Sequence, residues 1–247
     1  MPYLGDIEIN DLAVDKLYEW CNYLLQKGGK KENGISPKTV SDALSLIRRI
    51  ICHAASRGYK TLCTGKELSI NQPSKEINVL TRSEQDALCR YLYKHPCERN
   101  IGILLSLFTG LRIGELCALD WPDISLESGT IYIHKNIQRI QTKENSEKKT
   151  EIVITTPKSQ CSIRTIPIPE FLISFLGNAD IKRQGYLLTG NNKYLEPRTM
   201  ENHFHKILDE ISIRQVNFHT LRHTFATRCI EAVSYTHLRA HETEADL

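Results

Sequence analysis

Apolar residues recur at helical spacing in the first third of the chain. Between residues 10 and 26 they lie three or four positions apart, which predicts an amphipathic helix. A second helix is predicted to begin after Ser36, a good N-cap followed by Pro37, and to end near Gly58. The two apolar faces comprise Ala13, Leu17, Trp20, Cys21 and Leu24 in the first helix and Val40, Leu44, Ile47, Ile51 and Ala54 in the second.

This periodicity stops between Gly65 and Ile77, where polar residues and Pro73 indicate a linker. The sequence therefore predicts a boundary between a first domain, residues 1–72, and a second domain, residues 73–232.

Helical signals resume after the linker. The segment Thr81-Arg82-Ser83-Glu84 is a capping box, which predicts a helix from there to near Pro96. A buried helix is expected over residues 101–108, and Gly110 is suited to end it in a left-handed conformation. A short helix is then predicted to begin at Arg112, so that this side chain projects from a turn between two packed helices.

Between residues 130 and 169 the apolar pattern changes from helical spacing to alternation, and helical spacing then returns. Lys158 falls in the turn joining the last two predicted strands, which would form a hairpin. The expected fold class is mostly α with a small antiparallel β-sheet (α+β). The predicted strands are residues 130–134, 151–156 and 163–168, and the predicted helices are residues 170–176, residues 197–211 and one from near Thr220.

Composition excludes some classes of protein. The chain has 247 residues, of which 40% are hydrophobic and 25% charged, as in ordinary globular proteins. Its longest apolar run, residues 101–108, is too short to cross a bilayer, so we expect a cytoplasmic protein with no membrane partner. Eight cysteines without a Cys-x-x-Cys pair predict reduced thiols rather than disulfides or a zinc site.

The formal charge of +3 is unevenly distributed. Residues 1–75 carry 11 Lys and Arg against 8 Asp and Glu, a net +3, whereas residues 76–247 carry 21 of each. This excess alone indicates no more than a solvated surface with a few extra lysines.

Three distant segments carry candidate chemistry. Arginine offers a planar fork to phosphate oxygens, and lysine is a compact charge that can donate a proton. Taken singly, Arg112 would be a surface ion pair and Lys158 a solvated turn residue. Together the three segments provide what a site needs to grip one phosphodiester. They are Thr109-Gly110-Leu111-Arg112-Ile113-Gly114-Glu115-Leu116, Lys158-Ser159-Gln160-Cys161-Ser162-Ile163-Arg164 and His219-Thr220-Leu221-Arg222-His223.

In order and context these segments resemble the tyrosine recombinase (phage integrase) family over roughly residues 5 to 232. The resemblance implies that residues 1–72 form a helical core-binding domain, one jaw of a DNA clamp, and that residues 73–232 form the catalytic domain. It also implies that double-stranded DNA is the partner, that the complete enzyme works as a homotetramer on DNA, and that neither metal nor cofactor is required.

The resemblance assigns a role to each matching residue. Arg112 and Arg222 would clamp the scissile phosphate, and Lys158 would protonate the departing 5′ oxygen. His219 would hydrogen-bond the phosphate or help accept the nucleophile's proton. Supporting roles fall to Glu115 and His223, the second of which orders its neighbours.

The end of the chain departs from the family pattern. There the nucleophilic tyrosine follows the second arginine by roughly thirty residues, on a helix after a Leu-Gly-His segment. Here Tyr235 lies only 13 residues beyond Arg222 (235 − 222), and residues 233–247 contain no glycine and no apolar helical stripe. That segment resembles a translated sequencing adapter. We therefore expect a non-native tail after an incomplete catalytic domain, and no nucleophile in this chain.

The predicted function is site-specific DNA recombination or integration through a 3′-phosphotyrosine intermediate, with this fragment inactive. Three alternatives remain: a DNA-binding protein without catalysis, a type IB topoisomerase-like enzyme, and a metal-dependent nuclease. The helical first domain favours the recombinase over the topoisomerase. The nuclease ranks lowest because the sequence has no cluster of Asp, Glu and His ligands. The target DNA site and the kind of mobile element are not encoded in a recognisable way.

Overall fold

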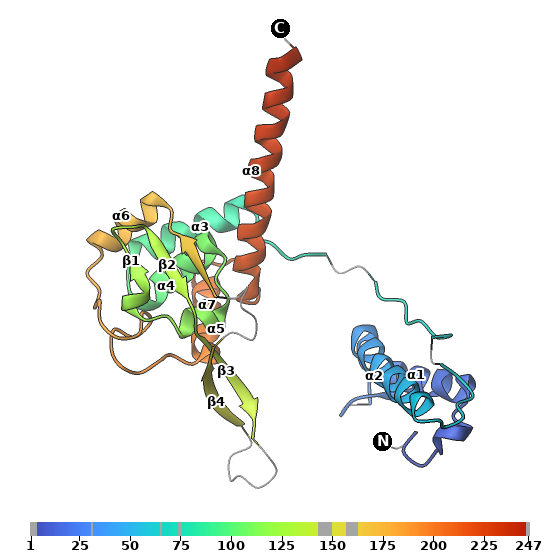
Figure 1. Ribbon diagram of the computed structural model, residues 1–247. Coiled ribbons are helices and arrows are strands. Elements are labelled where there is room, and N and C mark those ends of the chain that lie inside the picture. The colour runs from blue at the N-terminus through green and yellow to red at the C-terminus, as the bar shows by residue number, and fades with distance from the viewer. Residues whose placement is uncertain are drawn as a thin grey trace. The chain divides into compact units, whose positions relative to one another are not determined.

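The structure is a computed structural model that describes residues 4–30, 32–64, 66–73, 76–142, 150–156 and 163–245, with side chains up to residue 233. The chain divides into two compact units, Met1–Glu76 and Ile77–Leu247, each described by itself below (Figure 1). The division falls four residues beyond the boundary predicted between residues 72 and 73.

The first unit is built on two packed helices, α1 (Val14–Lys27) and α2 (Pro37–Ser56). The predicted N-cap of α2 is confirmed, since the Ser36 hydroxyl accepts a hydrogen bond from the Thr39 amide at 3.2 Å. The first helix was predicted to start too early. Ile9–Asp11 instead form a separate 3₁₀ turn (η1), because the backbone is extended at Leu12, whose side chain is buried in the core.

Helices form most of the second unit. The predicted capping box of α3 (Arg82–Lys94) is confirmed, with Thr81 and Glu84 exchanging hydrogen bonds. Nine of the twelve residues of α4 (Glu98–Thr109) are buried, and this helix packs against α3, α5, α7 and α8. The other helices are α5 (Ile113–Cys117), α6 (Glu170–Asn178), α7 (Pro197–Glu210) and α8 (His219–Ala245).

The strands form two antiparallel sheets, so the expected α+β class is confirmed while the predicted hairpin is wrong. The strand β4 (Thr150–Thr155) pairs with β3 (Asn136–Gln141), a strand that the sequence analysis missed. In the other sheet β5 (Arg164–Pro167) pairs with β2 (Thr130–Ile133), which also pairs with β1 (Ile124–Ser125) after a 3₁₀ turn, η2 (Trp121–Asp123).

The missed strand has a physical explanation. The sequence of β3, Asn-Ile-Gln-Arg-Ile-Gln, spaces its isoleucines three apart and lacks the alternation that marks a half-buried strand. It is held as a strand by its pairing with β4 over six residues on each side. The partner of each strand was therefore decided by tertiary pairing and not by neighbouring sequence.

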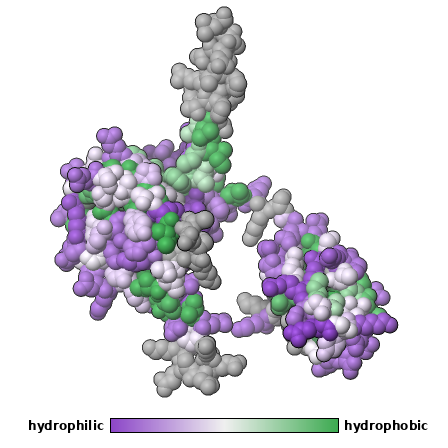
Figure 2. Space-filling model, in the orientation of Figure 1, coloured by the Kyte–Doolittle hydropathy of each residue, from purple (hydrophilic) through white to green (hydrophobic). Residues whose placement is uncertain are grey.

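The helix α8 begins in the body of the second unit and continues unbroken away from it to Ala245 (Figure 1). Residues 233–247 have no apolar helical stripe, and the helical backbone nevertheless runs through them to Ala245. Residues 219–245 contain neither Gly nor Pro to interrupt that helix. Ile230 and Val233 of α8 are exposed, and Figure 2 shows hydrophobic surface where the helix emerges from the second unit.

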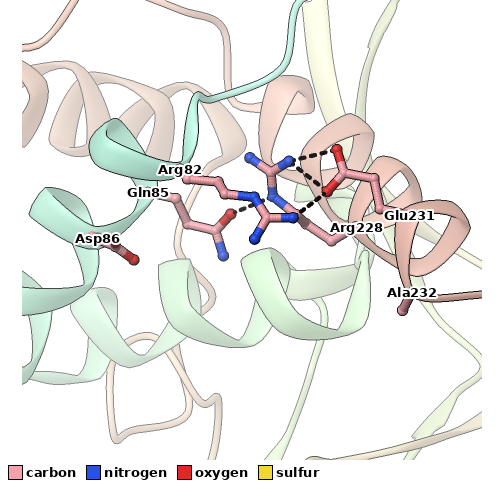
Figure 3. A pocket seen from close by; sticks show the side chains of 6 residues that line it. All are labelled: Arg82, Gln85, Asp86, Arg228, Glu231 and Ala232. Carbon is pink, nitrogen blue, oxygen red and sulfur yellow. Dashed lines mark hydrogen bonds and ion pairs between the residues drawn. The ribbon is translucent and has the colours of Figure 1, made fainter. Parts of the chain in front are cut away.

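A polar junction fixes α8 against the start of α3. Arg228 donates to the Leu80 carbonyl at 2.8 Å and to Gln85 at 3.1 Å, and it shares the Glu231 carboxylate with Arg82. These side chains line an open cavity of about 670 Å³ (Figure 3). A further bond runs from the Leu80 amide to the Thr224 hydroxyl at 2.9 Å. The first turns of α8 are thereby held in a fixed position.

We expect Gly110→Ala to destabilise the second unit by about 1 to 3 kcal/mol. Gly110 has φ +68°, and an added Cβ would lie 2.7 Å from Cδ1 of Phe225. Chemical denaturation should show the loss. Gly177→Ala is the matched control, because Gly177 lies within α6 and an added Cβ there meets nothing within 4 Å. Equal stability of the two variants would contradict the expectation.

Candidate phosphate-binding site

The turn between α4 and α5 positions Arg112. Gly110 ends α4 in the left-handed conformation, and Arg112 is the N-cap residue of α5. Its backbone amide donates to Oε2 of Glu115 at 3.0 Å, and its Nη1 donates to Oε1 at 2.9 Å. The Glu115 side chain is only 4% exposed, whereas that of Arg112 is 51% exposed. One end of the arginine is thus held from within the protein while the rest faces solvent.

The first turn of α8 positions His219 and Arg222. Asn217 accepts hydrogen bonds from the backbone amide and the hydroxyl of Thr220, at 3.0 and 3.1 Å. Leu221 is completely buried. With the turn fixed in this way, Nη1 of Arg222 donates to the Gly110 carbonyl, 112 positions away in the chain. Arg222 therefore lies against the same turn from which Arg112 projects.

The charges of these residues influence one another. Burial lowers the pKa of Arg222, and the positive charge of Arg112 lowers it further. Burial also lowers the pKa of His219, with additional contributions from His223, Arg222 and Arg112. The rings of His219 and His223 meet edge to face, with centroids 4.5 Å apart. The structure thus brings together Arg112, Glu115, His219, Arg222 and His223 of the sequence-predicted residues.

Arg164 also belongs to this cluster, and the sequence analysis did not assign it. Its Nη1 and Nη2 donate side by side to the two oxygens of Glu115, at 3.0 and 2.9 Å. A signal was available in the sequence. Arg164 is in phase with Ile166 on β5, and Ile166 packs against the core, so an arginine on that face of a strand needs a carboxylate partner.

The opposing contributions to the pKa of Glu115 illustrate how strongly it is held. Burial alone would raise the pKa, but hydrogen bonds from Arg164 and Arg112 outweigh burial, and the pKa is lowered. Glu115 is therefore an anion at neutral pH and the countercharge of the arginine cluster.

Comparison with known proteins identifies the family of the chain. The profile of the phage integrase family matches residues 78–238, which contain Arg112, Lys158, His219 and Arg222. The chain belongs to the phage integrase family. The matched region ends six residues into the segment predicted to be a non-native tail.

The relatives of this integrase-family chain include recombinases. It is 28% identical over 255 residues to a tyrosine recombinase XerC-like protein of Caldanaerobacter subterraneus subsp. tengcongensis. That alignment covers 92% of this chain, and the chain spans 63% of the length of that relative.

Solved integrase structures share the fold. The Tn1549 transposon integrase in complex with transposon right end DNA superposes with a TM-score of 0.70 at 19% identity, covering 93% of this chain and 76% of that one. A lambda integrase tetramer bound to a Holliday junction gives a TM-score of 0.61 at 17% identity, covering 92% and 62%.

Lys158 of the integrase-family chain lies outside the described residues. Tyr235 lies on the same helix as Arg222, 13 residues further along (235 − 222). At a rise of about 1.5 Å per residue, the two backbone positions are about 20 Å apart along the helix axis.

The part of the chain that the structure describes contains no group of three or more His, Cys, Asp or Glu side chains arranged to hold a metal ion. The seven cysteines among those residues form no disulfide, and burial raises the pKa of Cys117 to about 12, so this thiol is unreactive. None of the described helices is both long and apolar enough to cross a membrane.

We expect the integrase-family chain to lose stability as pH falls below about 6.5 through His203 and His219. Burial lowers the pKa of both imidazoles in the folded state, so the unfolded chain takes up protons first. Their contribution is complete above the unfolded value of about 6.5 and is lost as pH falls toward the lowered folded values. Thermal unfolding between pH 7.5 and 5.5 measures it.

Substitution separates these two histidines from other groups. His203→Gln keeps a donor for the Asn100 side chain, to which Nε2 of His203 is bonded at 2.7 Å, and should shrink the pH-dependent drop. Adding His219→Gln to His203→Gln should shrink the pH-dependent loss of stability further. An unchanged drop in the double variant would show that other groups cause it.

Proposed function

We propose that this chain belongs to a site-specific recombinase that cuts and rejoins double-stranded DNA through a 3′-phosphotyrosine, and that residues 77–232 supply its phosphate grip. The observation that carries the proposal is the bond from Arg222 to the Gly110 carbonyl, which puts a second guanidinium beside Arg112. A half-exposed arginine that projects from this turn and a more buried one that is bonded to its backbone suit one phosphate group.

The charges of the cluster suit the transition state better than the substrate. Three guanidiniums, of Arg112, Arg164 and Arg222, against the single carboxylate of Glu115 give a formal net charge of +2 (3 − 1). A phosphodiester carries one negative charge, and the pentacoordinate transition state approaches two. The cluster therefore stabilises the transition state, with its additional negative charge on the phosphate oxygens, more than it stabilises the bound substrate, and this difference is the condition for catalysis.

The reaction proposed for the complete enzyme is balanced without metal, cofactor or ATP. A tyrosine oxygen attacks phosphorus, the bond to the 5′ oxygen breaks, and Lys158 gives that oxygen a proton. His219 hydrogen-bonds the phosphate or helps accept the proton of the tyrosine. The reverse attack by the 5′-hydroxyl of a partner strand reseals the backbone.

We further propose that Tyr235 is not the nucleophile. The backbone of α8 separates residues 222 and 235 by about 20 Å, and the chain here carries no second tyrosine beyond Arg222. For this chain alone, DNA binding without strand cleavage is therefore the second candidate function. For the complete enzyme we propose a tetramer on DNA, in line with the lambda integrase tetramer.

We expect this chain to bind duplex DNA with an affinity that falls as salt rises, because each phosphate contact releases counterions. Fluorescence anisotropy with a labelled duplex at low and physiological salt measures this. Absence of binding at low salt would refute the proposal.

The same chain incubated with a nicked suicide duplex should give no covalent adduct on a denaturing gel. An adduct that disappears in Tyr235→Phe would identify Tyr235 as the nucleophile after all. Adduct formation only after a relative's C-terminal segment is joined after Ala232 would support the proposed division of roles.

A further inference from the structure

Glu115 connects two arginines that come from different layers of the second unit. Arg112 belongs to the α4–α5 turn, whereas Arg164 is the first residue of β5, opposite Ile133 of β2. Both carboxylate oxygens are shared. Oε1 accepts from Nη1 of each arginine, at 2.9 and 3.0 Å, and Oε2 accepts from the Arg112 amide at 3.0 Å and from Nη2 of Arg164 at 2.9 Å.

We propose that Arg164 is a positioning residue that orients Arg112 through the carboxylate of Glu115. This inference rests on the proposed function, in which Arg112 grips the phosphate. Arg164 itself need not touch DNA in this role, since its side chain is only 26% exposed compared with 51% for Arg112.

The geometry of the bonds supports this assignment. A parallel pair of N–H···O bonds from one guanidinium fixes the plane of a carboxylate as well as its position. Without Arg164, residue 112, the N-cap of the five-residue helix α5, would be the remaining partner of the carboxylate among the described residues. Arg164 therefore ties the orientation of the Glu115 carboxylate to strand β5, which the short helix α5 cannot do alone.

The consequence concerns the exposed end of Arg112. Its Nη1 bonds to the oxygen that also accepts from Arg164, so the direction of the guanidinium follows the orientation of the carboxylate. Arg222 approaches from a third element, α8, and is bonded to the backbone of the same turn. A rotation of Arg112 would therefore change the spacing between the two phosphate-gripping groups.

A DNA-free measurement tests the positioning directly. In a ¹⁵N-labelled chain, the Nε–Hε signal of Arg112 is assigned by its absence in Arg112→Ala. We expect a rigid signal, with a strong heteronuclear NOE, in the unchanged chain and a mobile, shifted signal in Arg164→Ala. Arg139→Ala is the matched control, because Arg139 also lies on a strand, β3, and pairs with a glutamate, Glu196. In this variant the Nε–Hε signal of Arg112 should be unchanged.

A double-mutant cycle on DNA affinity tests whether Arg164 acts through Arg112. Arg164→Ala should weaken duplex binding measurably but by no more than Arg112→Ala does, with about tenfold as the upper bound for one charged hydrogen-bonding group. In the Arg112→Ala background the same change should weaken it by less than about twofold. Equal losses in both backgrounds would mean that Arg164 contacts DNA itself, and would overturn the proposal.

The two measurements can refute the positioning role and the proposed function independently of each other. A rigid and unshifted Arg112 signal in folded Arg164→Ala refutes the positioning role, whatever the DNA affinity. A mobile signal without any duplex binding by the unchanged chain refutes the proposed function and leaves the positioning intact. If Arg164→Ala does not fold, as judged by circular dichroism, Arg164→Lys provides the same comparison, because it keeps the charge and cannot form the paired bonds.

Discussion

Arg222→Ala is expected to reduce covalent adduct formation by roughly 100- to 1000-fold in a chain completed with a relative's C-terminal segment after Ala232. The same loss is expected for Arg112→Ala, because the two guanidiniums stabilise charge that develops on the phosphate only in the transition state. Duplex affinity should fall far less, since other contacts along the DNA remain. Suicide-substrate cleavage on denaturing gels, together with anisotropy, measures both quantities.

The control is Arg183→Ala. Arg183, like Arg222, donates to backbone carbonyls, in this case those of Leu176 and Gly177, but it has no bond to the cluster around Glu115. Its replacement should leave adduct formation within a few-fold of the unchanged chain. Near-normal adduct formation in Arg222→Ala would remove this residue from the proposed clamp.

Glu115→Gln is expected to destabilise the second unit by about 3 to 5 kcal/mol, the usual effect of removing one partner of a buried ion pair. The change keeps the size of the side chain and removes the only carboxylate that accepts from both Arg112 and Arg164 among the described residues. Three guanidiniums would then repel one another without the countercharge of Glu115 between them. Urea unfolding followed by circular dichroism measures the loss.

A second glutamate provides a matched comparison. Glu231 also accepts from two arginines, Arg228 and Arg82, but it lies on the surface of α8 (Figure 3). Glu231→Gln should change stability little, because water screens an exposed ion pair and replaces its bonds. If the two variants are equally stable, burial of Glu115 does not have the energetic role assigned to it.

The pH dependence of the Glu115 interaction has a defined sign. Because its pKa is lowered in the folded state, its contribution is complete above the unfolded value of about 4.5 and is lost as pH falls below it. This window lies below that of His203 and His219, so the two groups of residues are separable in one pH series.

The sequence by itself determined the starts and ends of many helices. Ser36 and Thr81 cap helices through bonds to amides within three residues, and Gly110 ends α4 because its backbone conformation strains other residues. These interactions are local, so the residues that cause them are neighbours in the sequence. Several residues of the candidate site, although not Arg164, were also named from the sequence, because the segment around Arg112 and the segment around Arg222 resemble a known family.

The tertiary structure decided which segments meet. The pairing of β4 with β3 rather than β5 depends on contacts between strands, which neighbouring residues do not specify. The hydrogen bond from Arg222 to Gly110 joins two residues that are 112 positions apart in the chain. The paired bonds from Arg164 to Glu115 join two residues that are 49 positions apart. A carboxylate buried to 4% exposure must find its partners wherever the fold brings them, since unpaired burial of its charge is too costly.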